Sequence, residues 1–279
     1  MKAIFYQERN SRRSAVIAEA MAEGARRHSE TVTVAQWAGS PDGDCAVFYG
    51  WRQPEIADAY REAGKPFVHV DLGWWDRKPE GRPLEGYHKV SVNARDPTAY
   101  FRRSWPSDRF DHFGIVVSEW RWQRGRAILL AGMSAKSAGV QGFAPYEWER
   151  AAIAKLRAIT DREIIFRPKP SWLEARPIPG TTFSPSGEGL ALVFDRTWAV
   201  VTLTSNVAVD ALIAGLPIFA ERGVAAALSM PALSMVQDPP LPAGRHQLLA
   251  DIAYQQWSVP EMRSGDCWAF LKRGTPLCT

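Results

Sequence analysis

The sequence has 279 residues, of which 46% are hydrophobic and 12 are tryptophans. This composition excludes an intrinsically disordered chain, because it can bury enough apolar surface to offset the entropy cost of folding. The 34 lysines and arginines exceed the 30 aspartates and glutamates, and the net charge of +4 is compatible with an anionic ligand. The three cysteines are widely spaced, which indicates neither a disulfide framework nor a zinc site.

The sequence carries no sign of export or of a membrane span. Residues 1–9 become charged too early for the apolar part of a signal peptide. No apolar stretch approaches the roughly 18–20 residues that a membrane helix requires. We therefore expect a cytoplasmic protein.

The first part of the chain alternates apolar runs of strand length with helical patterns, which is typical of an α/β protein with a largely parallel sheet. The pattern predicts strands over residues 3–6, 31–35, 45–49 and 66–71 and helices over residues 14–23 and 54–63. Gly24 and Gly64 are expected to end these two helices. Residues 72–113 lose clear periodicity, so we predict irregular structure that carries side chains into a cleft. One more strand is expected over residues 111–117.

A second series of strands and helices begins near residue 126. The pattern predicts strands over residues 127–132, 163–167, 190–194, 198–202 and 215–219 and helices over residues 145–158 and 207–214. Two further helices are expected in the tail, over residues 246–256 and 260–272. The restart predicts a second α/β domain with a boundary within residues 121–126.

The most informative segment is residues 200–219, which combines a strand, a polar turn, a helix, a glycine and another strand. The turn consists of Thr204, Ser205 and Asn206. A helix that opens at the carboxyl end of a parallel strand is suited to anions, because its unpaired N–H groups and its dipole point at one spot. The three residues equally suit simple helix capping, which stays open as an alternative.

Thr204-Ser205-Asn206, followed by Val209-Asp210-Ala211-Leu212 and Gly215-Leu216-Pro217, resembles the donor-binding half of glycosyltransferases of the GT-B fold. These families include capsule-polysaccharide transferases and sugar-nucleotide 2-epimerases. The resemblance implies an α/β fold of two facing Rossmann-like domains. It implies an acceptor domain over residues 1–122, a nucleotide-sugar donor domain over residues 123–243, and C-terminal helices over residues 244–279 that pack back on the first domain.

The resemblance also implies which side chains contact the donor. Arg167 and Lys169 lie in a proline-stiffened turn after a strand, where they would offset charge on the leaving nucleoside diphosphate. A solvated basic loop is the alternative. Many members carry a histidine where Lys169 stands, so we expect no general acid at this position. Lys136 lies in the glycine- and serine-rich loop 132–139, which lacks the first glycine of a P-loop and thus disfavours kinase or ATPase chemistry.

The candidate catalytic base is Asp71. It ends an apolar strand at the edge expected to face a cleft, and an inverting transferase needs a carboxylate there to take the proton of the acceptor hydroxyl. A capping role is the alternative. Asp210 and Glu221 are candidates for binding the ribose hydroxyls of the donor.

The candidate acceptor contacts lie in and before a segment in which tryptophans and arginines are interleaved. Cations beside aromatic rings suit nucleic acids and sugars alike, and core tryptophans with solvated arginines are the alternative. The predicted acceptor residues are His69, Trp74, Trp75, His88, Arg102 and Arg103.

We therefore predict a nucleotide-sugar-dependent glycosyltransferase that acts as a monomer, with a UDP-sugar as the expected co-substrate and no further cofactor. We expect no metal, since we recognise no Asp-x-Asp motif and no cluster of histidine, aspartate and glutamate ligands. The preferred acceptor is a hydroxymethylated pyrimidine in double-stranded phage DNA, reached by base flipping in the host cytoplasm. A surface or capsular polysaccharide acceptor and a non-catalytic DNA-binding protein are the alternatives.

Overall fold

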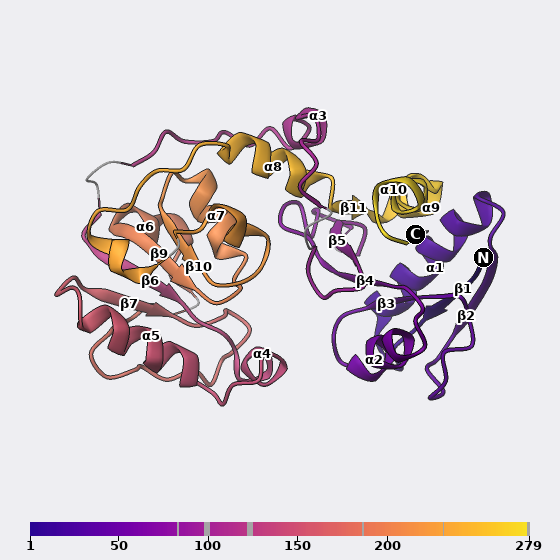
Figure 1. Ribbon diagram of the computed structural model, residues 1–279, viewed down its shortest axis with the longest axis horizontal. Helices are drawn as coiled ribbons and strands as arrows, with labels where there is room; N and C mark the ends of the chain where they lie inside the picture. Colours follow the sequence, from indigo (N-terminus) through magenta and orange to yellow (C-terminus); the bar gives the residue numbers. More distant parts are fainter. Residues whose placement is uncertain (83, 98–100, 122–124, 186, 231, 278–279) are drawn as a thin grey trace. The chain divides into compact units, whose positions relative to one another are not determined.

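The computed structural model describes residues 1–82, 84–97, 101–121, 125–185, 187–230 and 232–277. The chain divides into two compact units, each with its own sheet (Figure 1). Unit 1 comprises Met1–Phe113 and Ala250–Thr279, and unit 2 comprises Gly114–Leu249. In the part of the chain that is described, no helix combines the length and the hydropathy needed to cross a bilayer.

Unit 1 is built on a six-stranded sheet in the order β11-β5-β4-β3-β1-β2. Its strands are β1 (Lys2–Tyr6), β2 (Thr31–Ala35), β3 (Cys45–Tyr49), β4 (Phe67–Leu72), β5 (Tyr87–Val92) and β11 (Gln256–Ser258). The four predicted strands are confirmed as the parallel part of the sheet. β5 and β11 add an antiparallel edge, and both were missed because neither shows a clean apolar run in the sequence.

Helices cover both faces of this sheet. α1 (Arg12–Arg27), α9 (Val259–Ser264) and α10 (Asp266–Gly274) pack on the face that presents Phe5, Val47 and Val68. α2 (Pro54–Glu62) packs on the opposite face, where Ile4 and Phe48 lie. The predicted return of the C-terminal helices to the first domain is therefore confirmed. The strand predicted over residues 111–117 is wrong, since α3 (Asp108–Asp111) is followed there by irregular backbone.

Gly24 does not end α1, as the sequence predicted, but lies inside it. A Cβ at this position would collide with the carbonyl oxygen of Met262 and lie 3.1 Å from the Cα of Gly265. The glycine thus allows the backbone of α9 to approach α1 closely, which a side chain would prevent.

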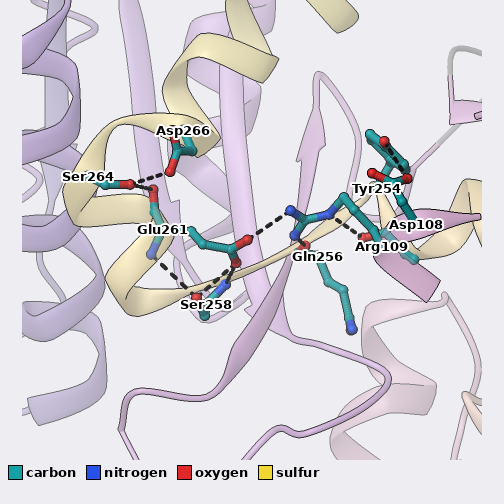
Figure 2. A network of polar contacts seen from close by, with 9 residues as sticks. Asp108, Arg109, Tyr254, Gln256, Ser258, Glu261, Ser264 and Asp266 are labelled. Carbon is teal, nitrogen blue, oxygen red and sulfur yellow. Dashed lines mark hydrogen bonds and ion pairs between the residues drawn. The ribbon is translucent and has the colours of Figure 1, made fainter. Parts of the chain in front are cut away.

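A polar network fixes the segment around α3 to the C-terminal segment within unit 1 (Figure 2). Arg109 Nη1 donates to Glu261 Oε1 at 2.8 Å, and Nη2 donates to the carbonyl oxygen of Gln256 at 2.9 Å. The guanidinium also lies 3.9 Å from the ring centroid of Trp257. Glu261 at the same time completes a capping box with Ser258 at the start of α9. Through these contacts Arg109 joins Gln256, Trp257 and Glu261 to α3.

Unit 2 contains a five-stranded parallel sheet in the order β10-β9-β6-β7-β8. Its strands are β6 (Ala127–Ala131), β7 (Ile164–Arg167), β8 (Thr182–Phe183), β9 (Thr197–Thr202) and β10 (Ile218–Ala220). The helices that begin in this unit are α4 (Ala135–Val140), α5 (Glu147–Arg157), α6 (Leu190–Asp195), α7 (Val207–Ile213), α8 (Arg245–Ala253) and the 3₁₀ segments η2 (Val224–Leu228) and η3 (Leu233–Gln237). The strand predicted over residues 190–194 is wrong. This run forms α6, in which Val193 and Phe194 are buried while Leu192 is 67% exposed.

Candidate functional site

The candidate donor site lies where the strand order of unit 2 reverses. β6 is followed along the chain by β7 on one side, whereas β9 pairs with its other side. Ligands of open α/β sheets bind outside the carboxyl ends of the strands at such a switch point. Thr202 Oγ1 donates to the carbonyl oxygen of Ala131 at 2.8 Å, which ties the two strand ends together. The loops that follow, residues 132–134 and 203–206, therefore start side by side.

The polar turn predicted to bind the donor lies in the second of these loops and is half-buried. The Ser205 N–H, predicted to face an anion, donates instead to Thr202 Oγ1 at 3.1 Å, and Ser205 Oγ accepts from the N–H of Val207 at 3.3 Å. Asn206 is the residue before α7, and its side chain makes no capping hydrogen bond. The capping interpretation thus fits Ser205, whereas Thr204 and Asn206 remain candidates for a ligand.

Glu149, which the sequence analysis missed, shapes the neighbouring loop. Its side chain extends from α5 and accepts the N–H of Met133 through Oε1 at 2.7 Å. A Cβ on Gly132 would lie 3.0 Å from this oxygen, so the glycine makes room for the carboxyl group. Burial raises the pKa of Glu149, against the effect of the Met133 N–H. The sequence does hold a signal for a buried glutamate here, because Glu149 lies three and four residues before Ala152 and Ile153, on the apolar face of the helix.

Glu221 and Lys136 lie at the same edge of the sheet, Glu221 on a loop and Lys136 in the first turn of a helix. Glu221 follows β10, its N–H donates to the carbonyl oxygen of Thr202 at 3.2 Å, and its exposed carboxylate accepts from Trp148 Nε1 at 2.9 Å. Lys136 is exposed in the first turn of α4, directly after the loop held by Glu149. Asp210 lies one turn into α7 and is half-buried.

Arg167 has contacts that differ from the predicted ones. It ends β7 and is 7% exposed. Its guanidinium donates to Ser184 Oγ at 2.8 Å, to the carbonyl oxygen of Pro185 at 3.2 Å and to that of Glu188 at 2.7 Å. Arg167 therefore anchors the segment that follows β8, and its diphosphate contact stays a prediction. Lys169, two residues further on, is exposed.

Asp71 is the penultimate residue of β4 in unit 1, at the carboxyl edge of the parallel strands. Burial alone would raise the pKa of Asp71. The charge of Lys89, which pairs opposite Asp71 on β5, and the N–H of Leu72 at 2.8 Å outweigh burial, so the pKa lies below the usual aspartate value. Burial and the charge of Asp71 raise the pKa of the nearby Tyr49 to about 12. Asp71 is thus an ionised carboxylate at neutral pH.

Several of the predicted acceptor residues belong to the core of unit 1. His69 and His88 are both 0% exposed, and the backbone N–H groups of Trp74 and Trp75 donate to Gln256 Oε1. The rings of the two tryptophans are buried. Arg102 and Arg103 are exposed. The acceptor roles of these six residues stay predictions.

An Asp-x-Asp sequence, which the sequence analysis overlooked, occurs at Asp42-Gly43-Asp44. Asp44 accepts the N–H of Lys2 at 2.7 Å and Asp42 accepts Ser40 Oγ at 2.7 Å. The two carboxylates precede β3 and therefore lie at the edge opposite to Asp71. Within the described ranges, no group of three histidine, cysteine, aspartate or glutamate side chains is arranged to hold a metal.

No protein-family model matches the sequence, and no curated protein matches it. Two solved structures are similar over nearly their whole length. The β-Kdo 2,4-transferase KpsC of Thermosulfurimonas dismutans is 12% identical with a TM-score of 0.54, covering 92% of this chain and 91% of its own. The β-Kdo 2,7-transferase KpsC of the same organism is 12% identical with a TM-score of 0.50, covering 96% and 98%. The UDP-GlcNAc 2-epimerase of Methanocaldococcus jannaschii, at a TM-score of 0.32, is too distant to carry an argument.

At such low identity these likenesses bear on the fold alone. They confirm the predicted fold class, a GT-B-like α/β protein with two Rossmann-like units.

Proposed function

We propose that the chain is a nucleotide-sugar-dependent glycosyltransferase. Unit 2 binds the donor at the switch point of its sheet, and unit 1 binds the acceptor and supplies Asp71. The observation that carries the proposal is this switch point, where the side chain of Asn206 is not used in capping and the loops after β6, β9 and β10 share one edge. Its support from outside is the fold, shared over nearly the whole chain with two sugar transferases.

In the donor site, each group has a chemical task. Thr204 and Asn206 donate hydrogen bonds to the diphosphate, and Lys136 and Lys169 offset the charge that builds on it as the bond to the sugar breaks. Glu221 accepts hydrogen bonds from the ribose hydroxyls. We assign Arg167 and Glu149 a positioning role, because both hold loops at this edge through hydrogen bonds, and the direct contact of Arg167 with the diphosphate stays a prediction.

Asp71 acts as the general base. Its lowered pKa keeps it ionised at neutral pH, so it can take the proton of the acceptor hydroxyl. The hydroxyl oxygen then bonds to the anomeric carbon, and the nucleoside diphosphate leaves with the electron pair of the broken bond. Lys136 and Lys169 neutralise that leaving group in place of a metal. Turnover is therefore expected to persist in EDTA.

A saccharide is the favoured acceptor. The two similar structures are Kdo transferases, which supports a sugar hydroxyl as the acceptor. The hydroxymethylated DNA expected from the sequence stays a prediction and forms one arm of the test.

The test begins with binding of UDP-, GDP-, CMP- and ADP-sugars to the full chain, measured by thermal shift and calorimetry. One nucleotide is expected to bind and stabilise the protein. The double variant Lys136→Gln/Lys169→Gln is expected to weaken the binding of that nucleotide by about tenfold or more, since each charge-assisted contact to phosphate is strong. Arg26→Gln/Lys155→Gln removes the same charge from exposed sites on α1 and α5 and serves as the matched control.

Product formation is then followed by mass spectrometry with oligosaccharide acceptors and with hydroxymethylated duplex DNA, with and without EDTA. Asp71→Asn should reduce turnover by about 10²–10⁴-fold while leaving nucleotide binding unchanged. The proposal fails if no nucleotide binds, or if Asp71→Asn retains full turnover.

A further inference from the structure

A pocket of about 600 Å³ lies in unit 1 among the start of α1, the loop before β5 and α9. Its described lining contains five cationic side chains, one acidic one and a set of apolar ones. They are Arg12, Arg13, Lys78, Arg82 and Arg263, then Glu85, then Val16, Leu84 and Val259. Three segments far apart in the sequence thus bring their cations to one cavity.

Folding alone gives no reason for this concentration of charge. α1 begins with Arg12 and Arg13 and has no acidic residue in its first turn, although the helix dipole favours negative charge there. Arg82 pairs with Glu85 at 3.2 Å, and Arg263 pairs with a glutamate of α1 at 3.2 Å. These pairs are solvent-exposed and weak, so the lining keeps an excess of positive charge that attracts an anion.

The pocket is linked to Asp71 through Arg13. Burial has the largest effect on both neighbouring rings: it raises the pKa of Tyr49 and lowers the pKa of His88. The charge of Arg13 acts to lower both pKa values, and the charge of Asp71 acts to raise both. Arg13 therefore belongs both to the pocket and to the surroundings of the candidate base. α1 begins after the carboxyl end of β1, so the pocket and Asp71 lie at the same edge of the sheet of unit 1.

We propose that this pocket binds a phosphate group of the acceptor, so that the proposed transferase acts on a phosphate-bearing substrate. The inference rests on the proposed function. Arginines bind phosphate oxygens in pairs of parallel hydrogen bonds, and Lys78 adds a point charge. Val16, Leu84 and Val259 form an apolar wall beside the cations, which suits the carbon skeleton attached to the phosphate. The phosphate belongs either to a soluble sugar phosphate or to a lipid headgroup.

The probe is inorganic tripolyphosphate, titrated into the full chain by calorimetry at low ionic strength. Arg12→Gln/Lys78→Gln removes two exposed cations of the pocket. This variant should weaken binding by about tenfold or more, because charge-assisted contacts to phosphate are lost. Arg26→Gln/Lys155→Gln removes equal charge from exposed sites on α1 and α5, and it should change binding by less than about twofold.

Equal weakening in Arg12→Gln/Lys78→Gln and in Arg26→Gln/Lys155→Gln, or no binding by the unaltered chain, overturns the proposal. Vesicles of phosphatidylcholine with phosphatidylglycerol distinguish the two sources. Capture of these vesicles that is lost in Arg12→Gln/Lys78→Gln supports a lipid phosphate, whereas tripolyphosphate binding without capture supports a soluble one. Duplex DNA that binds the pocket more tightly than tripolyphosphate overturns the proposal in favour of a nucleic-acid site.

Nucleotide binding is measured on the same samples. Loss of the proposed function appears as no nucleotide binding by the unaltered chain, with tripolyphosphate binding at the pocket intact. Loss of the pocket proposal leaves nucleotide binding intact, so the two failures are distinguishable.

Discussion

Acidification from pH 7 to pH 5 should destabilise unit 1 through two buried histidines. His69 and His88 are 0% exposed, and burial lowers the pKa of each to about 4. In each ring Nδ1 lies 2.8 Å from a backbone carbonyl oxygen, whereas Nε2 has no partner among the described residues. The charges of Lys89 near His69 and Arg13 near His88 oppose protonation further, and Asp71 favours it in both.

The sign follows from comparing the two states. The unfolded chain takes up protons near the ordinary histidine pKa of about 6.5, whereas the folded chain does so only near 4. The stabilisation is therefore complete above pH 6.5 or so and is lost as the pH falls toward 4. At pH 5 the loss is about 2 kcal/mol for each histidine, or roughly 4 kcal/mol for both, against a typical total of about 5–15 kcal/mol.

The buried carboxyl groups affect stability either below the pH range in which the two histidines act or in the opposite direction. Asp71 and Asp96 have lowered pKa values because nearby cations outweigh burial, so their stabilisation is lost only below pH 4 or so. Glu149 in unit 2 has a raised pKa, so its effect on stability opposes that of the histidines. The comparison is therefore made between variants rather than on the absolute curve.

The assay is urea unfolding, followed by circular dichroism at several pH values between 4.5 and 7, on His69→Asn and His88→Asn. Each variant should reduce the slope of the unfolding free energy against pH by about 1.4 kcal/mol per unit in the transition of unit 1, since one titrating group is removed. The slope is insensitive to a constant loss from the smaller side chain. His112→Asn, an exposed position, should keep the original slope. Unchanged slopes in both buried variants would refute the reasoning.

Three substitutions test the packing that holds each unit together. Arg109→Ala should lower the stability of unit 1 by about 2–4 kcal/mol by breaking the contacts to Glu261 and the C-terminal segment, with Arg109→Lys restoring only part. A loss below about 1 kcal/mol in urea unfolding would contradict this role. Gly24→Ala should destabilise unit 1 by about 2 kcal/mol or more, because a Cβ there collides with α9. A Cβ at Gly139 meets nothing within 4 Å, so Gly139→Ala should leave stability unchanged or increase it. Equal effects of the two variants on the melting temperature would count against the close approach of α9 to α1. Arg167→Ala should destabilise unit 2 by about 2–3 kcal/mol. If Arg167→Ala instead leaves stability unchanged and abolishes nucleotide binding in calorimetry, the predicted diphosphate contact is right and the anchoring role is wrong.

The parallel strands could be predicted from the sequence because a strand buried on both faces is an uninterrupted apolar run. β1, β3 and β6 all have this form, and their burial follows from composition alone. The same local reasoning located the turn at Thr204 and Asn206, since a strand, a polar turn and a helix are adjacent in the chain. Position at the carboxyl edge of a sheet follows from that order, whatever the rest of the fold.

The partners of polar side chains were decided only by the tertiary structure. β5 carries buried His88 and Ser91, which no periodic pattern would assign to a core, and their acceptors come from turns. Arg167 has the sequence context of a ligand-binding cation, yet its guanidinium donates hydrogen bonds to residues 17 to 21 positions further along the chain. Hydrophobic periodicity is a property of one segment and can be read from it. A hydrogen bond or a charged pocket requires the coordinates of both partners, and for the pocket of unit 1 these partners come from three separate parts of the chain.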